Sequence, residues 1–305
     1  MSYMVNGRSG RAYNPRMQSA GSHSVEALVR AGLGLLEAHS DSPRLDTELL
    51  LAHALGWPRA ALYTRRADRL APEAVERCFA LLRERQSGRP VAQITGRRDF
   101  WTLTLAVTPD VLVPRPETEL AVERALARLP DTPGARLVDL GTGSGAIALA
   151  VASERPAARV LATDRSAAAL AVARANAVHA GLGQVDFAEG DWFEAAPGSW
   201  DVVVSNPPYV GEAELPQLAR DLGHEPRVAL TPGPDALAAL RQIATAARGH
   251  LAAGGWLVLE HGATQGGEVN ALLRSLGYES VATSLDLARL PRVTEGRWPG
   301  AFRGE

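Results

Sequence analysis

The chain contains 305 residues, which is enough for about two domains. Hydrophobic residues make up 46% of it and charged residues 22%, a balance typical of globular proteins. The formal net charge of −2 argues against charge-driven binding to nucleic acid or to an anionic membrane surface.

Three residue types limit the chemistry further. Cys78 is the only cysteine, so a disulfide framework and a cysteine-based metal site are excluded. The seven histidines lack metal-ligand spacing, and we expect no metal. All 32 basic residues are arginines, which excludes a Schiff-base lysine and a P-loop lysine. No apolar run reaches the ~18 residues that span a bilayer, and no secretory segment is evident, so we expect a cytoplasmic protein.

The first third of the sequence is predicted to be a tail followed by helices. Residues 1–21 are rich in Gly, Ser, Arg and Asn, and we predict that they are disordered. Helical spacing over residues 22–92 predicts a small bundle, with helices near 25–38, 43–55, 59–63 and 72–86. Ser42 and Pro43 provide an N-cap and a first helical residue for the second of these helices. Its predicted apolar stripe consists of Leu45, Leu49, Leu50 and Leu55.

Residues 93–113 are predicted to form a linker hairpin. Apolar and polar residues alternate from Phe100 to Val107, which predicts one arm of that hairpin. Prolines on both sides then hold Arg115 in an extended loop from Val113 to Glu119, ahead of a helix predicted over residues 120–129. An ordinary linker is the alternative interpretation of this loop.

The remainder, residues 114–305, alternates predicted strands and helices. This pattern is typical of a mostly parallel sheet covered by helices on both faces. Strands are predicted over 136–140, 158–163, 185–188, 202–205 and 256–260, with a closing antiparallel pair over 278–285 and 292–297. Helices are predicted over 146–153, 167–180, 234–254 and 268–275.

The strand that begins at Val202 ends in Asn206-Pro-Pro-Tyr209. Neither proline can donate a backbone hydrogen bond, so the strand must stop at Asn206. An amide, rigidly held carbonyl groups and an aromatic ring then project beyond the strand end. The carbonyl groups of Asn206 and Pro207 can accept two hydrogen bonds from a planar NH2 group, and Tyr209 can lie against its plane. An ordinary strand-terminating turn is the alternative interpretation.

A glycine-rich turn follows an earlier strand, at Gly141-Thr142-Gly143-Ser144-Gly145. Alternate glycines let the backbone turn sharply and approach a ligand closely. The spacing differs by one residue from the G-x-G-x-x-G pattern that places a pyrophosphate at a helix N-terminus. A phosphate-free cofactor such as S-adenosyl-L-methionine fits this turn better. Asp164 ends the next strand, where it can accept both ribose hydroxyls, and Asp191 or Trp192 can flank the adenine.

These segments resemble those of the class I methyltransferases. They are most similar to the protein-(glutamine-N5) methyltransferases that modify class 1 peptide chain release factors. In the second half, the shared segments are 139–150, 163–164, 191–193 and 205–209. The resemblance extends over residues 22–298 and includes 90–96, 100–101, 113–119, 224–226, 259–262 and 292–294.

The resemblance implies an α/β protein with a class I methyltransferase, Rossmann-like fold. A mostly parallel seven-stranded sheet is accompanied in that family by an N-terminal helical bundle and a β-hairpin linker. Residues 22–92 would then recognise the substrate and residues 114–305 would form the catalytic domain. The implied cofactor is S-adenosyl-L-methionine. The implied substrate is the glutamine of the GGQ motif in class 1 release factors, which supports translation termination. We expect a monomer that binds neither nucleic acid nor a membrane.

The resemblance also implies roles for particular residues. Cofactor binding falls to Gly141, Thr142, Gly143, Ser144, Gly145, Asp164, Asp191, Trp192 and Asn206. Substrate binding falls to Asn206, Pro207, Pro208 and Tyr209, together with Arg115 and Glu119 of the proline loop. The predicted catalytic residues are Asn206, Pro207 and Tyr209. In this hypothesis Asn206 Oδ1 and the Pro207 carbonyl fix the amide nitrogen for in-line transfer, and no strong base is needed.

One departure and three alternatives accompany this interpretation. Family members often carry a Gly-Gly-x-Asp-Gly stretch where this chain has residues 231–236, which affects surface detail. A ribosomal-protein glutamine methyltransferase would share the same site. An adenine-N6 or guanine-N2 methyltransferase would share it too, but should show a basic surface along a nucleic-acid strand. A cofactor-binding docking module without catalysis is the third alternative.

Overall fold

The computed structural model describes residues 23–217 and 220–300, and it divides into two compact units between Thr95 and Gly96. The predicted tail, residues 1–21, lies outside the described residues. The hairpin predicted within residues 93–113 belongs to the second unit. The domain limits from the sequence, 22–92 and 114–305 on either side of the linker, remain a proposal.

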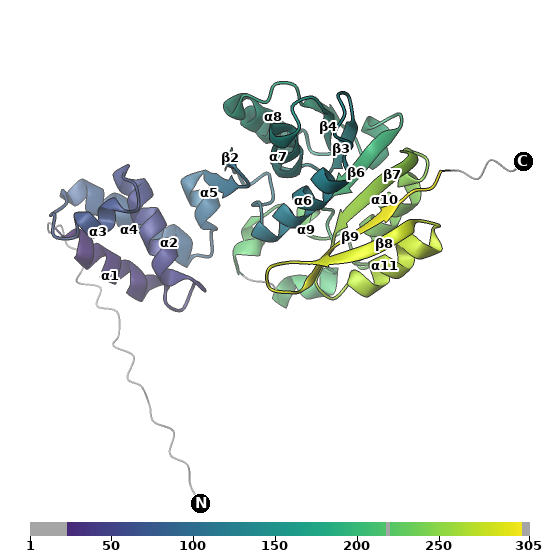
Figure 1. Ribbon diagram of the computed structural model, residues 1–305. Coiled ribbons are helices and arrows are strands. Elements are labelled where there is room, and N and C mark those ends of the chain that lie inside the picture. Colours follow the sequence, from purple (N-terminus) through teal and green to yellow (C-terminus); the bar gives the residue numbers. More distant parts are fainter. Residues whose placement is uncertain (1–22, 218–219, 301–305) are drawn as a thin grey trace, which may run out of the picture. The chain divides into compact units, whose positions relative to one another are not determined.

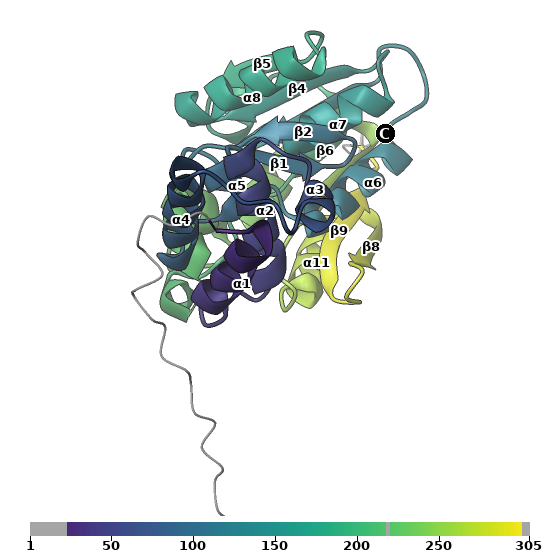
Figure 2. The ribbon, with the colours of Figure 1, turned by 90° about the vertical axis from the view of Figure 1, so that its left-hand side faces the viewer.

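The first unit is a helical bundle (Figures 1 and 2). Its helices are α1 (Val25–Leu36), α2 (Pro43–Leu55), α3 (Ala61–Thr64), α4 (Pro72–Gln86) and α5 (Val91–Thr95). Helices α1, α2 and α4 pack around one core that includes Leu28, Leu36, Leu50, Leu51 and Leu82. The unit therefore buries its own apolar core.

The predicted apolar stripe of α2 is confirmed for Leu50 and Leu55, which pack in this core, but it is wrong for Leu45 and Leu49. Leu45 and Leu49 are 42% and 37% exposed, whereas Leu50 and Leu51 are fully buried. The reason is that the buried face also carries Asp46, whose carboxylate accepts a 2.7 Å hydrogen bond from Arg85 of α4. Ser42 holds the N-cap position, but its hydroxyl does not cap the helix and donates to Asp46 instead.

The second unit begins with the hairpin of β1 (Arg97–Phe100) and β2 (Leu103–Ala106). The prediction of one continuous arm from Phe100 to Val107 is wrong, because the chain reverses at Trp101, whose φ is +55°. A distant carboxylate stabilises this turn: Glu119 Oε1 accepts a 3.0 Å hydrogen bond from the Trp101 backbone N–H. The alternating pattern predicted β2 but could not reveal this contact.

A seven-stranded sheet forms the centre of the second unit, in the order β5-β4-β3-β6-β7-β9-β8 (Figure 1). The strands are β3 (Arg136–Leu140), β4 (Arg159–Asp164), β5 (Asp186–Glu189), β6 (Trp200–Ser205), β7 (Leu251–Glu260), β8 (Glu279–Leu285) and β9 (Pro291–Arg297). Strands β3 to β7 are parallel, and β9 runs antiparallel to both β7 and β8. The predicted fold class and the closing antiparallel pair are confirmed.

Helices cover both faces of this sheet. Leu137, Val202 and Val258 pack with the helices α6 (Glu119–Arg128) and α7 (Ala146–Glu154). Their neighbours Val138, Val203 and Leu257 pack on the opposite face, with α10 (Ala238–Ala247) and α11 (Gly266–Ser275). Helix α8 (Ala167–Ala180) contacts β4 and β5. Because both faces are covered, the central strands are apolar on both sides.

The remaining elements are short. They are η2 (Pro116–Thr118), η3 (Trp192–Ala195), η4 (Glu212–Gln217), η5 (Arg220–His224) and α9 (Arg227–Leu230). The helix predicted over 234–254 is too long, because α10 ends at Ala247 and β7 already begins at Leu251. Pairing of Leu251 with Trp200, and a hydrogen bond from the Trp200 N–H to the His250 carbonyl, draw this segment into the sheet.

The strand register brings four strand ends to one level. Leu140 lies opposite both Thr163 and Ser205, and Ser205 lies opposite Leu259. The next residues, Gly141, Asp164, Asn206 and Glu260, therefore form a row at the carboxyl edge of the sheet. The strand order reverses between β3 and β6, and ligands of open α/β sheets bind at such a reversal.

Candidate active site

The glycine turn is a tight, left-handed connection from β3 to α7. Gly141, Gly143 and Gly145 have φ values of 73°, 56° and 86°, which cost other residues about 1–2 kcal/mol each. A Cβ atom on Gly145 would also lie 3.0 Å from Leu149 Cδ1. The backbone N–H groups of Gly141 and Thr142 both donate to the Thr163 carbonyl, so β4 fixes the start of the turn.

The buried Asp139 carboxyl group supports the turn through hydrogen bonds. Its Oδ2 accepts hydrogen bonds from the Thr142 hydroxyl at 2.6 Å and from the Ala148 N–H at 3.2 Å, in the first turn of α7. The other oxygen, Oδ1, is buried without a hydrogen-bond partner among the described residues. Burial raises the pKa of Asp139 to about 7, against the lowering effect of these two hydrogen bonds. This carboxyl group therefore already occupies the N-terminus of α7.

Asp164 holds the opposite side of the turn. Its Oδ2 accepts from the Gly143 N–H and its Oδ1 accepts from the Ser166 N–H, each at 2.9 Å. A carboxylate offers about four acceptor positions, so two remain for hydroxyl groups of a ligand. Asp139 and Asp164 together take up amide donors that a pyrophosphate would need, and the Asp164 carboxylate would repel its charge. The turn is therefore unsuited to a dinucleotide.

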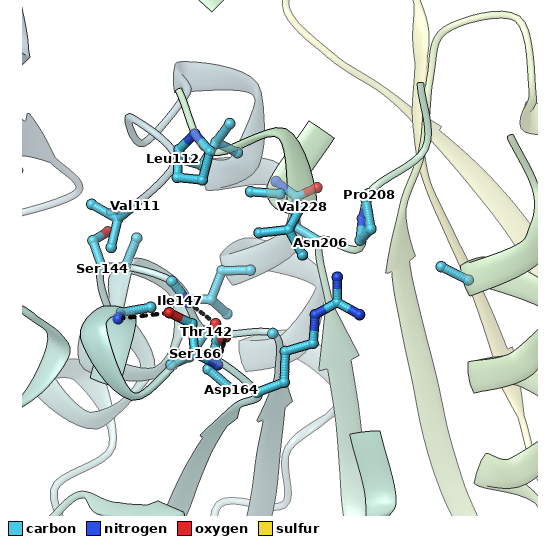
Figure 3. Close-up of a pocket in the computed structure, with 18 of the residues that line it drawn as sticks. Val111, Leu112, Thr142, Ser144, Ile147, Asp164, Ser166, Asn206, Pro208 and Val228 are labelled. Carbon is cyan, nitrogen blue, oxygen red and sulfur yellow. Dashed lines mark hydrogen bonds between the residues drawn. The ribbon is translucent and has the colours of Figure 1, made fainter. Parts of the chain in front are cut away.

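A cavity of about 270 Å³ opens above this turn, and we name it the glycine-turn cavity. Figure 3 shows Thr142, Ser144 and Asp164 on one side of it and Asn206, Pro208 and Val228 on another. Asp191 and Trp192 also line it, and the Trp192 ring lies 3.5 Å from the Cβ position of Gly141. Sequence reasoning missed the apolar walls contributed by Val111, Leu112, Ile147 and Val228.

A second cavity of about 290 Å³ lies on the other side of Asn206, and we name it the Tyr209 cavity. Pro207, Tyr209 and Glu260 line it, as do the charged residues Arg115, Glu117 and Arg292. The residues that line both cavities are Leu112, Arg115, Asn206 and Ala229. Asn206 therefore stands where the two cavities meet.

The Asn206–Tyr209 segment is held by three side chains from other parts of the chain. Asn206 Nδ2 donates to Thr118 Oγ1 at 3.2 Å, and the Tyr209 hydroxyl donates to Glu260 Oε1 at 3.3 Å. Gln265 Nε2 donates to the Tyr209 carbonyl at 2.9 Å. Burial, followed by the nearby Glu260 charge, raises the pKa of Tyr209, so the phenol stays protonated as a donor.

A buried ion pair holds the proline loop. Glu225, which follows η5, pairs with the Arg115 guanidinium and also accepts a 3.1 Å hydrogen bond from the Val113 N–H. Burial raises the pKa of Glu225, although the Arg115 charge opposes this shift. The loop that supplies Arg115 and Thr118 is thereby tied to the segment that precedes α9.

The structure brings most of the predicted site residues together. Among the predicted cofactor residues, Gly145 does not line the glycine-turn cavity but begins α7 beneath it. Glu119 lines neither cavity, because its carboxylate accepts a hydrogen bond from the Trp101 backbone N–H. Sequence reasoning missed Thr118 and Glu225 as site residues and did not assign Glu260 a role, although all three lie in segments that carried the family resemblance.

Comparison with known proteins places both units in one family. A model described as PrmC N-terminal domain matches residues 26–96, and one described as methyltransferase small domain matches residues 119–237. Release factor glutamine methyltransferase of Xylella fastidiosa is 52% identical over 258 residues, covering 84% of this chain and 94% of that protein. The Burkholderia pseudomallei and Escherichia coli proteins of the same name are 50% and 42% identical, covering 84% and 88% of this chain and 92% and 97% of their own.

Solved structures support the fold. The hMettl16 catalytic domain in complex with MAT2A 3'UTR hairpin 1 matches with a TM-score of 0.55, at 13% identity, over 70% of this chain and 82% of that one. Its complex with hairpin 6 matches with a TM-score of 0.54, at 12% identity, over 70% and 83%. At these identities the likeness shows a shared arrangement of strands and helices and nothing about function.

Proposed function

Because this chain belongs to the family of release factor glutamine methyltransferases, we propose that its two cavities hold the two reactants on either side of Asn206. The enzyme transfers a methyl group to a glutamine of a release factor. In our proposal the glycine-turn cavity binds S-adenosyl-L-methionine, and the Tyr209 cavity receives the glutamine side chain. The position of Asn206 in the lining of both cavities carries this proposal.

The residues around the glycine turn fit S-adenosyl-L-methionine. The Asp164 carboxylate, which lines this cavity, favours a ligand that carries cationic groups over one that carries phosphates. Asp164 has acceptor positions left for the ribose hydroxyls, and the half-buried Trp192 ring offers a flat apolar wall for the adenine. When bound, the cofactor supplies an electrophilic methyl group on a sulfonium centre.

Asn206, Pro207 and Tyr209 orient the substrate amide. Asn206 uses its NH2 group for Thr118, so its Oδ1 is the atom left to accept one N–H of the glutamine. The Pro207 carbonyl accepts the second N–H, and the Tyr209 ring packs against the plane of the amide. Two acceptors on one NH2 group fix the nitrogen and favour its pyramidal form, with the lone pair directed at the methyl group.

Positioning supplies most of the acceleration in this scheme. An amide nitrogen is a weak nucleophile because its lone pair is delocalised into the carbonyl group. Correct alignment of two reactants can contribute roughly 7–11 kcal/mol. Oxygen acceptors that tighten as positive charge grows on the nitrogen add electrostatic stabilisation. The new C–N bond would form as the C–S bond breaks and leaves a neutral thioether, and the cationic N-methylated amide would then lose its acidic proton to water.

The remaining expectations concern partners and surroundings. We propose that the helical bundle contributes to binding the release factor, and that Arg115 at the cavity boundary contacts its substrate segment. Glu119 is left out of this contact set because of its bond to Trp101. We further propose a monomer that acts in the cytoplasm without nucleic acid. None of the helices in residues 23–217 and 220–300 is long and apolar enough to cross a membrane.

A methyl-transfer assay tests the proposal. The purified enzyme is incubated with S-adenosyl-L-methionine labelled on the methyl group and with a release factor, in parallel with the same release factor carrying Gln→Ala at the methylated position. We expect label only in the first protein. Ribosomal protein and duplex DNA serve as controls, and label in either of these instead would overturn the substrate assignment. Asn206→Ala should remove transfer while S-adenosyl-L-methionine binding, measured by calorimetry, weakens less.

A further inference from the structure

The carboxamide of Asn206 can be placed in two orientations that differ by exchange of its oxygen and its NH2 group. Only one of them presents Oδ1 to a substrate NH2 group. The other presents a second NH2 group, which cannot accept a hydrogen bond. The proposed reaction therefore requires something in the protein that fixes this orientation.

Thr118 is the partner of Asn206, but a hydroxyl group alone does not fix the orientation. Thr118 Oγ1 accepts a hydrogen bond from Asn206 Nδ2 at 3.2 Å, and Thr118 is only 4% exposed. A hydroxyl can equally well donate to an amide oxygen. The direction of this hydrogen bond is decided by the acceptor that takes the Thr118 proton.

Glu260 offers an acceptor position for this proton. It ends β7 at the level of Asn206, is 1% exposed, and its Oε2 is buried without a hydrogen-bond partner among the described residues. Burial raises the pKa of Glu260 to about 7, while the hydroxyl of Thr118, the charge of Arg292 and the hydroxyl of Tyr209 lower it. Both hydroxyl groups favour the ionised carboxylate, which predominates above about pH 7 and only accepts hydrogen bonds.

We propose that Thr118 and Glu260 are positioning residues that orient the Asn206 amide with its oxygen toward the substrate glutamine. The Thr118 proton is directed to Glu260, so Thr118 must accept from Asn206 Nδ2, and Oδ1 faces the substrate. The same carboxylate accepts from the Tyr209 hydroxyl. One buried group on the neighbouring strand thereby holds both ends of the Asn206–Tyr209 segment. This inference rests on the proposed function and adds to it the origin of the amide orientation.

Two substitutions at Thr118 test the proposal. Thr118→Val keeps the shape of the side chain and removes the hydroxyl group, whereas Thr118→Ser keeps the hydroxyl group. We expect kcat with a release factor to fall roughly 10–100-fold in Thr118→Val, because misplaced reactive groups cost about that much. Binding of S-adenosyl-L-methionine, measured by calorimetry, should remain near that of the wild type. Thr118→Ser should restore most of the turnover, which a role in packing alone would not predict.

Glu260→Gln tests the second member of the chain. A glutamine at this position can either accept from Thr118 or donate to it, so it no longer fixes the direction. We expect an intermediate loss of kcat, about tenfold, with a smaller change in KM. Thr47→Val is the matched control, because it makes the same substitution at a fully buried threonine whose hydroxyl has no partner among the described residues. Its turnover should equal that of the wild type.

The outcomes separate this inference from the proposed function. If the wild type methylates the release factor and both Thr118→Val and Glu260→Gln stay within about twofold of it, the positioning role is overturned and the function stands. If the wild type transfers no methyl group, the function itself fails. Thermal unfolding identifies a variant that does not fold. If Thr118→Val does not fold, the other two variants decide. An active Thr118→Ser together with a slower Glu260→Gln supports the proposal, and equal activity of Thr118→Ser and Glu260→Gln overturns it.

Discussion

The two cavities that meet at Asn206 are built in different ways. The floor of the glycine-turn cavity is shaped largely by the backbone, since the turn, the amide groups that bind Asp164 and the support from Asp139 lie within 30 residues of one another. The Tyr209 cavity combines side chains from the loop at 112–117, the residues that follow β6, residues 222–230, Glu260 and Arg292. The hydrogen-bonded floor of the glycine-turn cavity is thus local in sequence, whereas the Tyr209 cavity is assembled from side chains of distant segments.

Because the two cavities are built differently, we expect substitutions in them to affect cofactor binding and catalytic turnover separately. The backbone of the glycine turn changes little when one side chain is replaced, apart from the glycines themselves. The Tyr209 cavity depends on individual hydrogen bonds between side chains, such as those of Thr118 and Tyr209. Substitutions on the two sides should therefore affect different measured constants, and the following predictions are ordered from the largest effect to the smallest.

Asn206→Ala should produce the largest change. It removes the amide oxygen that we propose as an acceptor for the substrate, and loss of one such aligned group typically costs about 10²–10³-fold in kcat. Binding of S-adenosyl-L-methionine should weaken much less, because the turn and Asp164 remain. Steady-state kinetics and calorimetry on the same preparation measure both effects. Turnover close to that of the wild type would contradict the proposed role of Asn206.

Asp164→Ala should act in the glycine-turn cavity, on cofactor binding. The substitution removes acceptors for the ribose hydroxyls and also frees the Gly143 and Ser166 N–H groups. Hydrogen bonds to a charged group contribute about 1.5–3 kcal/mol, so the Kd for S-adenosyl-L-methionine should rise about 10–100-fold. At saturating cofactor, kcat should recover most of its wild-type value. A lower kcat with an unchanged Kd would instead assign Asp164 to the chemistry.

Glu225→Gln tests how firmly the distant segments of the Tyr209 cavity are held. The new amide can still accept from the Val113 N–H, but Arg115 loses its charged partner. We expect the free energy of unfolding to fall by about 1–3 kcal/mol, since Arg115 is 30% exposed and can partly rehydrate. KM for the release factor should rise, whereas the Kd for S-adenosyl-L-methionine should not. Denaturant titration and kinetics distinguish these effects, and equal stability of the two proteins would argue against the ion pair.

The pH dependence of stability should be the smallest effect. Burial raises the pKa values of Asp139 and Glu260 from 3.8 and 4.5 to about 7, so the folded state keeps protons that the unfolded state releases. Their contribution to stability is therefore greatest at low pH, falls as the pH rises from about 4 to 7, and is constant above that. Glu295 has the opposite sign: burial alone would raise its pKa, but hydrogen bonds from Arg124 and Arg128 lower it, so its contribution is lost as the pH falls through the folded pKa.

Variants isolate these contributions. Asp139→Asn and Glu260→Gln should each flatten the decline in the free energy of unfolding between pH 5 and pH 7, and Glu295→Gln should reduce the loss below pH 4. Denaturant midpoints measured across this range provide the comparison. A decline that is unchanged in Asp139→Asn and in Glu260→Gln would show that other groups dominate it.

Much of the fold could be read from the sequence because its signals are local. Apolar runs that end in a glycine turn or in prolines predicted β3 and β6 and the residues that follow them. The hairpin was harder, because its reversal at Trp101 depends on Glu119, a residue that comes after the hairpin in the chain. Part of the α2 stripe failed for a similar reason, since a buried Asp46 is tolerated only because Arg85 of another helix binds it.

The sequence by itself determined the strand ends, the glycine turn and the amide at the end of β6, because backbone conformation there depends on neighbouring residues. Only the tertiary structure decided which side chains support them. Thr118 and Glu260 lie 142 residues apart in the chain, yet the sheet register brings Glu260 level with Asn206 and the Thr118 hydroxyl accepts from Asn206 Nδ2. Burying a polar group is costly unless folding supplies hydrogen-bond partners for it. Those partners come from whichever strand or loop lies nearest in space, which local sequence patterns do not record.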